Sequence, residues 1–453
     1  MTDVPGHTIG MVPIMHDADI RFLHIGVNQA TPLPPVPPIF KWKYDNKEII
    51  VMYQGDYGEV AEFDDFIVYF AHTHDNLGPQ SANEVKKIYK TICNEYPDYK
   101  IKAATLDDVA RRIETLKDLP IIDKEIGDTW IHGAGTDPQK ISRYRNVLRY
   151  ISEHKNSDVD LTDNLLLIPE HTCGMDVKTH FHDLRHYTPL QMNKCKDKRR
   201  KIEKSWEEQR NYVYNAEKLL NIKTDYPINE PDLSLYEETE IPDNFNIEVS
   251  WQIFDRDDYN RYKKDYMRSR VYWAIWDFTK VGLPQYQRDI YDAKIVKCYK
   301  NGDDIIYKLE FDSQIAKKHG LPYFYLQLKE NRIELKWFGK KASRIPQACW
   351  LKIKGLNEDW ELNKMDVWIK PDDILGSPLI SAVDQGVRNK DYVIKPLDSV
   401  LVAPYGRKLL QYNVKEKNQD LYFNLYNNIW NTNFPIWYSD DALFRFDILQ
   451  ITN

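Results

Sequence analysis

The sequence lacks the signals of a membrane protein and of a nucleic-acid-binding protein. No apolar run approaches the roughly 18 residues that would predict a membrane span. Positive charge is not in excess, because 62 basic residues accompany 69 acidic ones and the net charge is −7. The basic stretch 194–204 is followed by glutamates at helical spacing, which indicates a solvated helix face. We therefore expect neither nucleic acid nor a membrane as a partner.

Cysteine is also scarce. The chain has five cysteines, widely spaced and without a CxxC pair, so it predicts neither a disulfide framework nor a thiolate zinc site. This usage favours a reducing compartment, and hence the cytoplasm, with secretion as the alternative if N-terminal residues are missing. No GxSxG elbow, nucleophilic Cys-His context or phosphate-binding glycine loop occurs either. Any catalytic site is therefore expected to consist of carboxylates and histidines.

Apolar runs and helical periodicity divide the chain into three parts. Residues 1–137 alternate short apolar runs with helical segments, which predicts an α/β domain with a parallel sheet or a β/α barrel. Residues 138–285 carry long amphipathic patterns and predict a helical middle region. Residues 286–453 show strand-like alternation and an Asn-Gly hairpin turn at 301–302, which predicts a C-terminal antiparallel β-sandwich.

Several local elements follow from the same patterns. A buried strand is expected at 21–27, and a strand that runs into a polar loop at 65–76. The proline-rich stretch 31–42 predicts an extended loop or a lid, neither helix nor central strand. Helices are predicted at 82–96 and 105–119, and further helices at 139–154, 196–220 and 256–280.

Five short segments gather Asp, Glu, His and Gly where the barrel strands should end. They are DVPGHT (3–8), QGDYG (54–58), HTHDNLGP (72–79), EIGDTWIHGAGTDP (125–138) and EHTCGMD (170–176). Loops at the carboxyl ends of barrel strands form active sites, so we expect these segments to converge. Carboxylates and imidazoles with interleaved glycines suit a zinc-dependent hydrolytic site.

Each segment also has a structural explanation when it is taken alone. Asp3 can cap a turn before Pro5-Gly6, and Asp128 can cap a helix. Asp137 before Pro138 is typical of a helix start. His72 and His74 can be ordinary core histidines. The catalytic interpretation therefore depends on all five segments together.

In their order, the segments resemble a branch of proteins related to the glycoside hydrolase family 38 α-mannosidases. That family has Asp-Pro-Phe-Gly-His-Ser where this chain has DVPGHT, and the motif resemblance covers residues 1 to about 180. It implies a zinc-dependent retaining glycosidase that acts on a glycan. By this resemblance Asp3 is both zinc ligand and nucleophile, His171 is a zinc ligand, and Asp75 is the general acid/base. A retaining enzyme needs its two carboxyl groups roughly 5 to 5.5 Å apart.

The resemblance also implies a sugar pocket and a missing strand. The substrate-binding residues it implies are His7, His74, Glu125, Asp128, Trp130 and His132. In the family an earlier strand supplies a His-x-Asp pair that completes the zinc site. The resemblance therefore implies a partial β/α barrel here, to whose site the loop 170–176 returns. We therefore expect that Met1 is an internal methionine and that the polypeptide as written is inactive or poorly folded.

Two other functions stay open at this point. A non-catalytic carbohydrate-binding protein could keep the fold and lack the site. A different zinc hydrolase, such as a sugar N-deacetylase, would use the same ligand types. The oligomeric state is not predicted.

Overall fold

The computed structural model describes residues 2–73, 75, 77–154, 159–356, 359–377, 380–412 and 421–451. The chain divides into two compact units. The first comprises Met1–Trp130, Tyr266–Ser269 and Asp372–Ser377, and the second comprises Ile131–Asp265, Arg270–Pro371 and Pro378–Asn453. The division into three domains at 137 and 285 stays a prediction.

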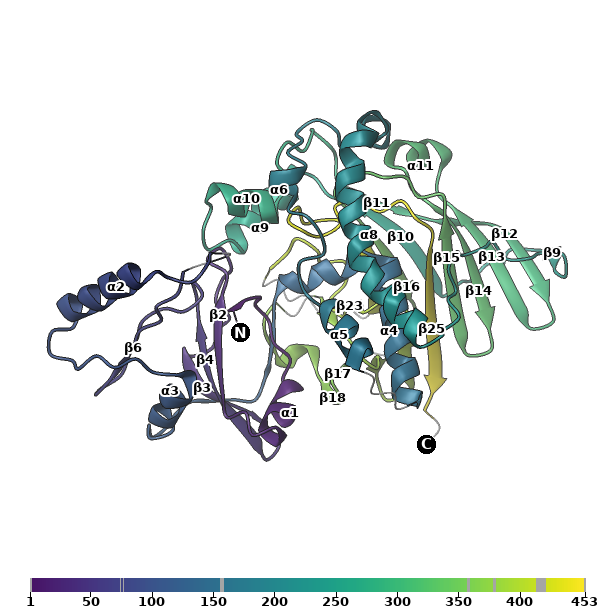
Figure 1. The fold of residues 1–453 in the computed structure, drawn as a ribbon. Coiled ribbons are helices and arrows are strands. Elements are labelled where there is room, and N and C mark those ends of the chain that lie inside the picture. The colour runs from purple at the N-terminus through teal and green to yellow at the C-terminus, as the bar shows by residue number, and fades with distance from the viewer. Residues whose placement is uncertain are drawn as a thin grey trace. The chain divides into compact units, whose positions relative to one another are not determined.

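The first unit is built on a five-stranded mixed sheet (Figure 1). Strands β1, β2 and β4 run parallel, whereas β3 is antiparallel to β4 and parallel to β7. In sheet order the strands are β1 (Thr2–Asp3), β2 (Phe22–Val27), β4 (Lys47–Gln54), β3 (Ile39–Tyr44) and β7 (Ile121–Ile122). Two small ladders complete the unit: β5 (Ala61–Glu62) with β6 (Ile67–Val68), and β8 (Glu125–Gly127) with β19 (Ile374–Gly376).

The described strands of this unit form an open sheet, so the predicted β/α barrel is not confirmed. The chain passes from β3 to β4 through a tight hairpin turn at Asp45, where a βα unit would place a helix. The predicted loop at 31–42 is wrong from Ile39 onward, because β3 begins there and lies between β4 and β7. The prolines end at Pro38, so every residue of β3 keeps the N–H that the ladder needs.

The described part of the first unit contains three helices, and side chains cap the second and the third of them. They are α1 (Met11–Asp17), α2 (Ala82–Glu95) and α3 (Leu106–Ile113). Ser81 and Thr105 form capping boxes with Glu84 and Asp108, which satisfy otherwise unpaired backbone N–H groups of the first turn. The predicted helices are thereby confirmed, although α3 ends six residues early. The strand predicted at 65–76 is confirmed only as the two residues of β6.

The second unit carries the helical middle region. Its helices are α4 (Pro138–His154), α5 (Val159–Leu167), α6 (Val177–His180), α7 (Pro189–Met192), α8 (Lys196–Leu219), α9 (Arg256–Asp265), α10 (Tyr272–Phe278) and α11 (Ser313–His319). The helix predicted at 256–280 is therefore broken into α9 and α10. In the described part of the chain, no helix has both the length and the apolar character of a membrane span.

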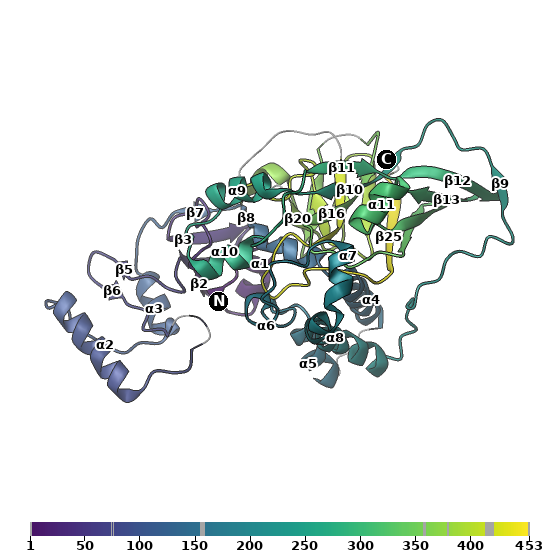
Figure 2. The ribbon, with the colours of Figure 1, turned by 90° about the horizontal axis from the view of Figure 1, so that it is seen from above.

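Helices α4 and α8 lie side by side (Figures 1 and 2). Asp137 caps α4 by accepting a hydrogen bond from the backbone N–H of Lys140 at 3.1 Å, which confirms its structural explanation. The other carboxylate oxygen of Asp137 accepts from Arg210 of α8 at 2.7 Å, and both side chains are nearly buried. This ion pair and a second one between Arg143 and Glu217 connect the two helices.

Two antiparallel sheets form the rest of the second unit. The six-stranded sheet has the order β11 (Asp289–Asp292), β10 (Ile247–Ile253), β16 (Gln347–Ile353), β24 (Leu421–Asn427), β23 (Leu401–Ala403) and β20 (Ser381–Ala382). The ten-stranded sheet has the order β18 (Val367–Ile369), β17 (Glu361–Lys364), β21 (Val387–Arg388), β22 (Tyr392–Pro396), β25 (Ala442–Gln450), β15 (Arg332–Phe338), β14 (Tyr323–Lys329), β13 (Asp304–Glu310), β12 (Lys294–Asn301) and β9 (Glu237–Thr239).

Buried aromatic rings join these sheets. Trp251 of β10 and Trp337 of β15 have ring centroids 5.8 Å apart, and Phe423 of β24 lies 4.9 Å from Phe446 of β25. Contacts of this kind between two antiparallel sheets are consistent with the predicted β-sandwich. The predicted hairpin is confirmed, with Asn301 paired to Asp304 across the turn.

Candidate functional site

Three polar side chains meet at one edge of the sheet in the first unit. The carboxylate oxygen Oδ1 of Asp3 accepts a hydrogen bond from the Asn28 amide at 3.0 Å and one from the Tyr57 hydroxyl at 3.4 Å. The same amide nitrogen of Asn28 donates to the Tyr57 hydroxyl oxygen at 3.2 Å. We call Asp3, Asn28 and Tyr57 the strand-edge cluster.

Strand direction explains why these residues meet. Asp3 ends β1, Asn28 follows β2, and Tyr57 follows β4 by three residues. These strands are parallel neighbours, so their carboxyl ends lie at the same edge, where ligands of α/β proteins commonly bind. The backbone N–H of Asn28 also donates to the carbonyl oxygen of Asp3, which ties the two strand ends together.

The turn that presents Tyr57 has an unusual backbone. Asp56, Tyr57 and Gly58 have φ values of 48°, 62° and 141°. A left-handed conformation is uncommon for a bulky aromatic residue and costs about 1 to 3 kcal/mol, which neighbouring contacts must offset. Asp3 itself has a φ of 82°. Strained residues tend to cluster at functional sites. Here two of them, Asp3 and Tyr57, belong to the strand-edge cluster.

Asp75 belongs to the electrostatic surroundings of this cluster. Burial is the main reason why the pKa of Tyr57 is raised, and the negative charges of Asp3 and Asp75 raise it further. Tyr57 therefore stays protonated at neutral pH and can donate its hydrogen to a carboxylate. The imidazole of His72 lies edge-on to the Tyr57 ring and contacts the carbonyl oxygen of Gly58 at 3.2 Å. The negative charges of Asp3 and Asp75 thus both contribute to the raised pKa of one hydroxyl group.

Gly26 allows the turn to lie directly on β2. A Cβ atom on Gly26 would stand 2.3 Å from the carbonyl carbon of Tyr57, a backbone atom that cannot swing away. We expect Gly26→Ala to lower the free energy of unfolding by about 1 to 3 kcal/mol and to displace Tyr57. Thermal unfolding and ligand-binding measurements check this. Gly78→Ala is the matched control, because a Cβ there meets nothing within 4 Å, and equal effects of both changes would contradict the prediction.

The segment 4–9 is held by residues that the sequence predicted to bind substrate. In this segment the backbone of His7 pairs with that of Ile126. Burial lowers the pKa of the His7 side chain to about 4. Glu125 is 1% exposed, and its carboxylate accepts the backbone N–H of Ile9 at 2.7 Å. Both residues therefore fix the segment that follows Asp3, and a direct role in substrate binding stays a prediction.

Asp128 is a buried carboxyl group beneath the same segment. Gly6 has a φ of 81° and lies close to Asp128. A Cβ atom on Gly6 would stand only 3.0 Å from the Cβ of Asp128. Oδ1 of Asp128 accepts hydrogen bonds from the Trp130 backbone N–H at 2.9 Å and the Tyr266 hydroxyl at 2.8 Å. Burial raises the pKa of Asp128 to about 7. Its predicted capping role is confirmed, because the bond to Trp130 starts the 3₁₀ helix Thr129–Gly135.

The remaining predicted residues are distributed between the two units. Trp130 ends the first unit, whereas His132 and His171 belong to the second. His132 is buried, its pKa is lowered to about 3 by that burial, and its carbonyl oxygen accepts the Asn427 amide at 2.9 Å. His171 pairs with Glu170 at 2.6 Å. His74 lies outside the described residues.

The candidate donors among the described residues do not form a complete zinc centre. Catalytic zinc sites use three protein ligands, whereas the resemblance supplies only Asp3 and His171. Within the described ranges, no group of three or more His, Cys, Asp or Glu side chains is placed to hold a metal ion.

Sequence reasoning missed Asn28 and Tyr57. Asn28 directly follows the strand that was predicted at 21–27, so its position at a strand end was a usable signal. Tyr57 lies within QGDYG, which was singled out for its acid and glycines and not for its tyrosine. Tyr266 could not be predicted to contact Asp128, because 138 residues separate them.

Comparisons with known proteins give a partial family match and distant structural likeness. Residues 134–230 match the family described as Domain of unknown function (DUF5054), which is less than half of the chain. No curated protein sequence matches. Among solved structures, an alpha-mannosidase from Enterococcus faecalis V583 is similar at 8% identity and a TM-score of 0.46, over 98% of this chain and 73% of that one. A 4-alpha-glucanotransferase from Thermococcus litoralis has 9% identity and a TM-score of 0.20, over 98% and 81% of the two chains. At these scores the likeness is distant, and membership of glycoside hydrolase family 38 stays a prediction.

Proposed function

We propose that this protein, in the form that its source cells produce, acts on a glycan as an α-mannosidase-like retaining glycoside hydrolase. Asp3 is the proposed nucleophile and Asp75 the proposed general acid/base. The observation that supports this proposal is that Asp3 accepts a hydrogen bond from the Tyr57 hydroxyl at the carboxyl edge of parallel strands, while the negative charge of Asp75 also raises the pKa of that hydroxyl. A glycosidase of the common type needs two carboxyl groups at one site.

The neighbouring residues support this assignment by positioning Asp3. Hydrogen bonds from Asn28 and Tyr57 hold Oδ1 of Asp3, while the backbone of the following segment is fixed by Glu125. A fixed carboxylate loses little conformational freedom when it attacks an anomeric carbon. Asp75 is exposed on its turn, where it can reach the oxygen of a departing group.

Non-catalytic glycan binding is the second candidate. It is favoured by one observation, namely that the described residues offer no set of three metal ligands, which a family-38-like zinc mechanism needs. A sugar N-deacetylase needs the same kind of metal site, and no observation favours it over the others. Zinc dependence stays a prediction, which metal analysis before and after dialysis against a chelator tests.

A panel of aryl glycosides tests the proposed function. We expect the protein, produced in its source cells, to release the aryl group from an α-mannoside and to give a sugar product of retained anomeric configuration by proton NMR. Acetate release from N-acetylated sugars without glycoside cleavage would instead identify a deacetylase. Binding of glycans without any cleavage would overturn the enzymatic proposal in favour of the binding protein.

A further inference from the structure

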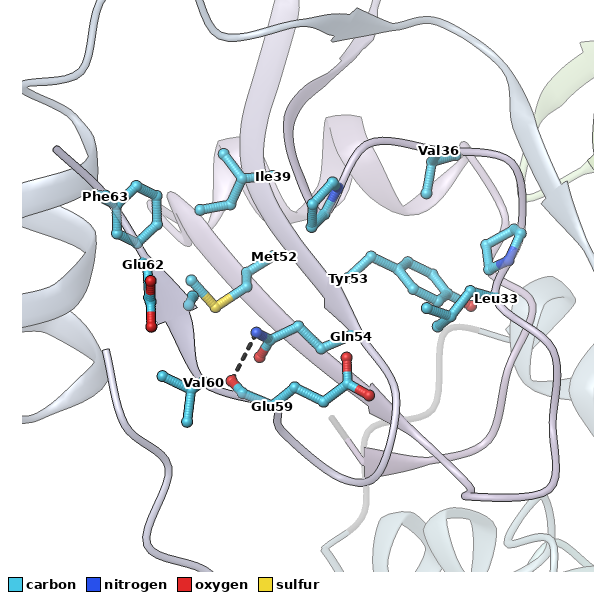
Figure 3. A pocket seen from close by; sticks show the side chains of 13 residues that line it. Leu33, Val36, Ile39, Met52, Tyr53, Gln54, Glu59, Val60, Glu62 and Phe63 are labelled. Carbon is cyan, nitrogen blue, oxygen red and sulfur yellow. Dashed lines mark hydrogen bonds between the residues drawn. The ribbon is translucent and has the colours of Figure 1, made fainter. Parts of the chain in front are cut away.

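A cavity of about 390 Å³ lies within the first unit (Figure 3). Its walls are the proline-rich loop before β3, the strands β3 and β4, and the segment 59–63. Gln54 and Glu59 line the cavity and flank the turn that carries Tyr57. The turn that carries Tyr57 therefore connects two residues of the cavity wall. A volume of this size is sufficient for an aromatic ring with substituents.

Most of the cavity wall is apolar. Leu33, Val36, Ile39, Met52 and Phe63 contribute side chains to it, and Leu33 stands at its exposed rim. Neither lysine nor arginine occurs among the described residues that line it, whereas two glutamates do. This charge pattern disfavours an anionic ligand and suits a neutral apolar one.

The polar groups of the wall are already engaged within the protein. The Gln54 amide contacts His24 at 3.1 Å and donates to the Glu59 carbonyl oxygen at 2.8 Å. The Glu59 carboxylate accepts from Arg268 at 2.8 Å, and Glu62 accepts from the Tyr96 hydroxyl at 3.0 Å. A sugar ring needs a hydrogen-bond partner for each hydroxyl group that it buries. The cavity therefore suits an apolar group better than a second sugar.

From this geometry we infer that the cavity is a binding site for a neutral apolar or aromatic aglycone of the glycoside. This inference rests on the proposed function, because it places the sugar at the strand-edge cluster and the aglycone in the cavity whose wall residues Gln54 and Glu59 flank the Tyr57 turn. The substrate class is then a glycoside of a phenol or of a branched apolar alcohol, rather than an oligosaccharide.

Equilibrium binding tests the site without depending on catalysis. By titration calorimetry we expect phenyl α-mannoside to bind at least about 10-fold more tightly than methyl α-mannoside. Val60→Asp places a charge at the rim of the cavity and should reduce that preference at least about five-fold. Val85→Asp is the matched control, because Val60 and Val85 are both 40% exposed and Val85 does not line the cavity. Equal binding of both glycosides, or equal effects of the two variants, would overturn the inference.

A probe without sugar separates this inference from the proposed function. Free 4-methylumbelliferone, held neutral at about pH 6, should bind to the unmodified protein and to Val85→Asp, and more weakly to Val60→Asp. If it does so and no glycoside is cleaved, the cavity site stands and the proposed hydrolase fails. If glycosides are cleaved while phenyl and methyl mannosides bind equally, the hydrolase stands and the cavity site fails.

Discussion

Asp3→Asn is expected to lower kcat/KM for glycoside hydrolysis by about 10³-fold or more. Asparagine has the same shape, tolerates a positive φ, and can still accept the hydrogen bonds from Asn28 and Tyr57. It has no carboxylate to attack the anomeric carbon, so the loss should appear in catalysis and leave folding intact. Initial rates with an aryl glycoside and thermal unfolding of the same samples measure both quantities.

Asp19→Asn is the matched control for this variant. Asp19 also has a positive φ, of 57°, but its side chain is exposed and pairs with Arg21. We expect the control to keep full activity and stability. A similar loss of activity in both variants, or unchanged activity in Asp3→Asn, would remove Asp3 from the catalytic assignment.

Asp75→Asn tests whether Asp75 is the general acid, because loss of the acid and loss of the nucleophile depend differently on the leaving group. Acid assistance contributes about 10² to 10⁴-fold when the leaving group is poor and much less when it is a weakly basic phenol. The variant should therefore be strongly impaired with a methyl glycoside and mildly impaired with a dinitrophenyl glycoside. Asp3→Asn should be impaired with both substrates. The same dependence on the leaving group in both variants would contradict the two assigned roles.

Local sequence patterns predicted those elements whose signals lie within a few residues of each other. Thr105 and Asp137 mark helix starts by their own capping bonds, and the Asn301 turn specifies its hairpin. The sheet of the first unit could not be predicted in this way. The position of β3 between β4 and β7 depends on pairings between distant segments. The strand itself was not predicted, because the proline-rich run before Ile39 indicated a loop.

The residues of the candidate site also divide into those that local motifs predicted and those that only the strand order brings together. Asp3 and Asp75 were predicted from motif resemblance, which needs no knowledge of strand order. Asn28 and Tyr57 contact Asp3 from 25 and 54 residues away, and only the parallel order β1, β2 and β4 brings them together. Glu125 was predicted to bind substrate, but in the structure its carboxylate accepts a hydrogen bond from a backbone N–H. Motif resemblance does not distinguish a carboxylate that binds substrate from one that holds the backbone.

Asp128→Asn is expected to change how the stability of the first unit depends on pH. The folded pKa of Asp128, about 7, is higher than its ordinary value of 3.8 because burial disfavours the charged form. Between about pH 4 and pH 7 the folded chain therefore keeps a proton that the unfolded chain has released. The free energy of unfolding falls with rising pH in this range by about 1.4 kcal/mol per pH unit from this group, and the effect is complete above about pH 7.

The asparagine variant should lack this dependence, because its amide has no proton to lose and its Oδ1 can still accept from Trp130 and Tyr266. We therefore expect Asp128→Asn to match the unmodified protein near pH 4 and to be more stable by roughly 4 kcal/mol at pH 8. Urea unfolding across this pH range measures the difference between the two curves. That difference cancels the opposite contribution of His7, whose lowered pKa costs stability as the pH falls below about 6.5. Asp123→Asn alters an exposed aspartate of the same segment and should leave the curve unchanged. Parallel curves for Asp128→Asn and the unmodified protein would mean that Asp128 is ionised in the folded state, and the segment that follows Asp3 would then lie over a charge and not over a neutral acid.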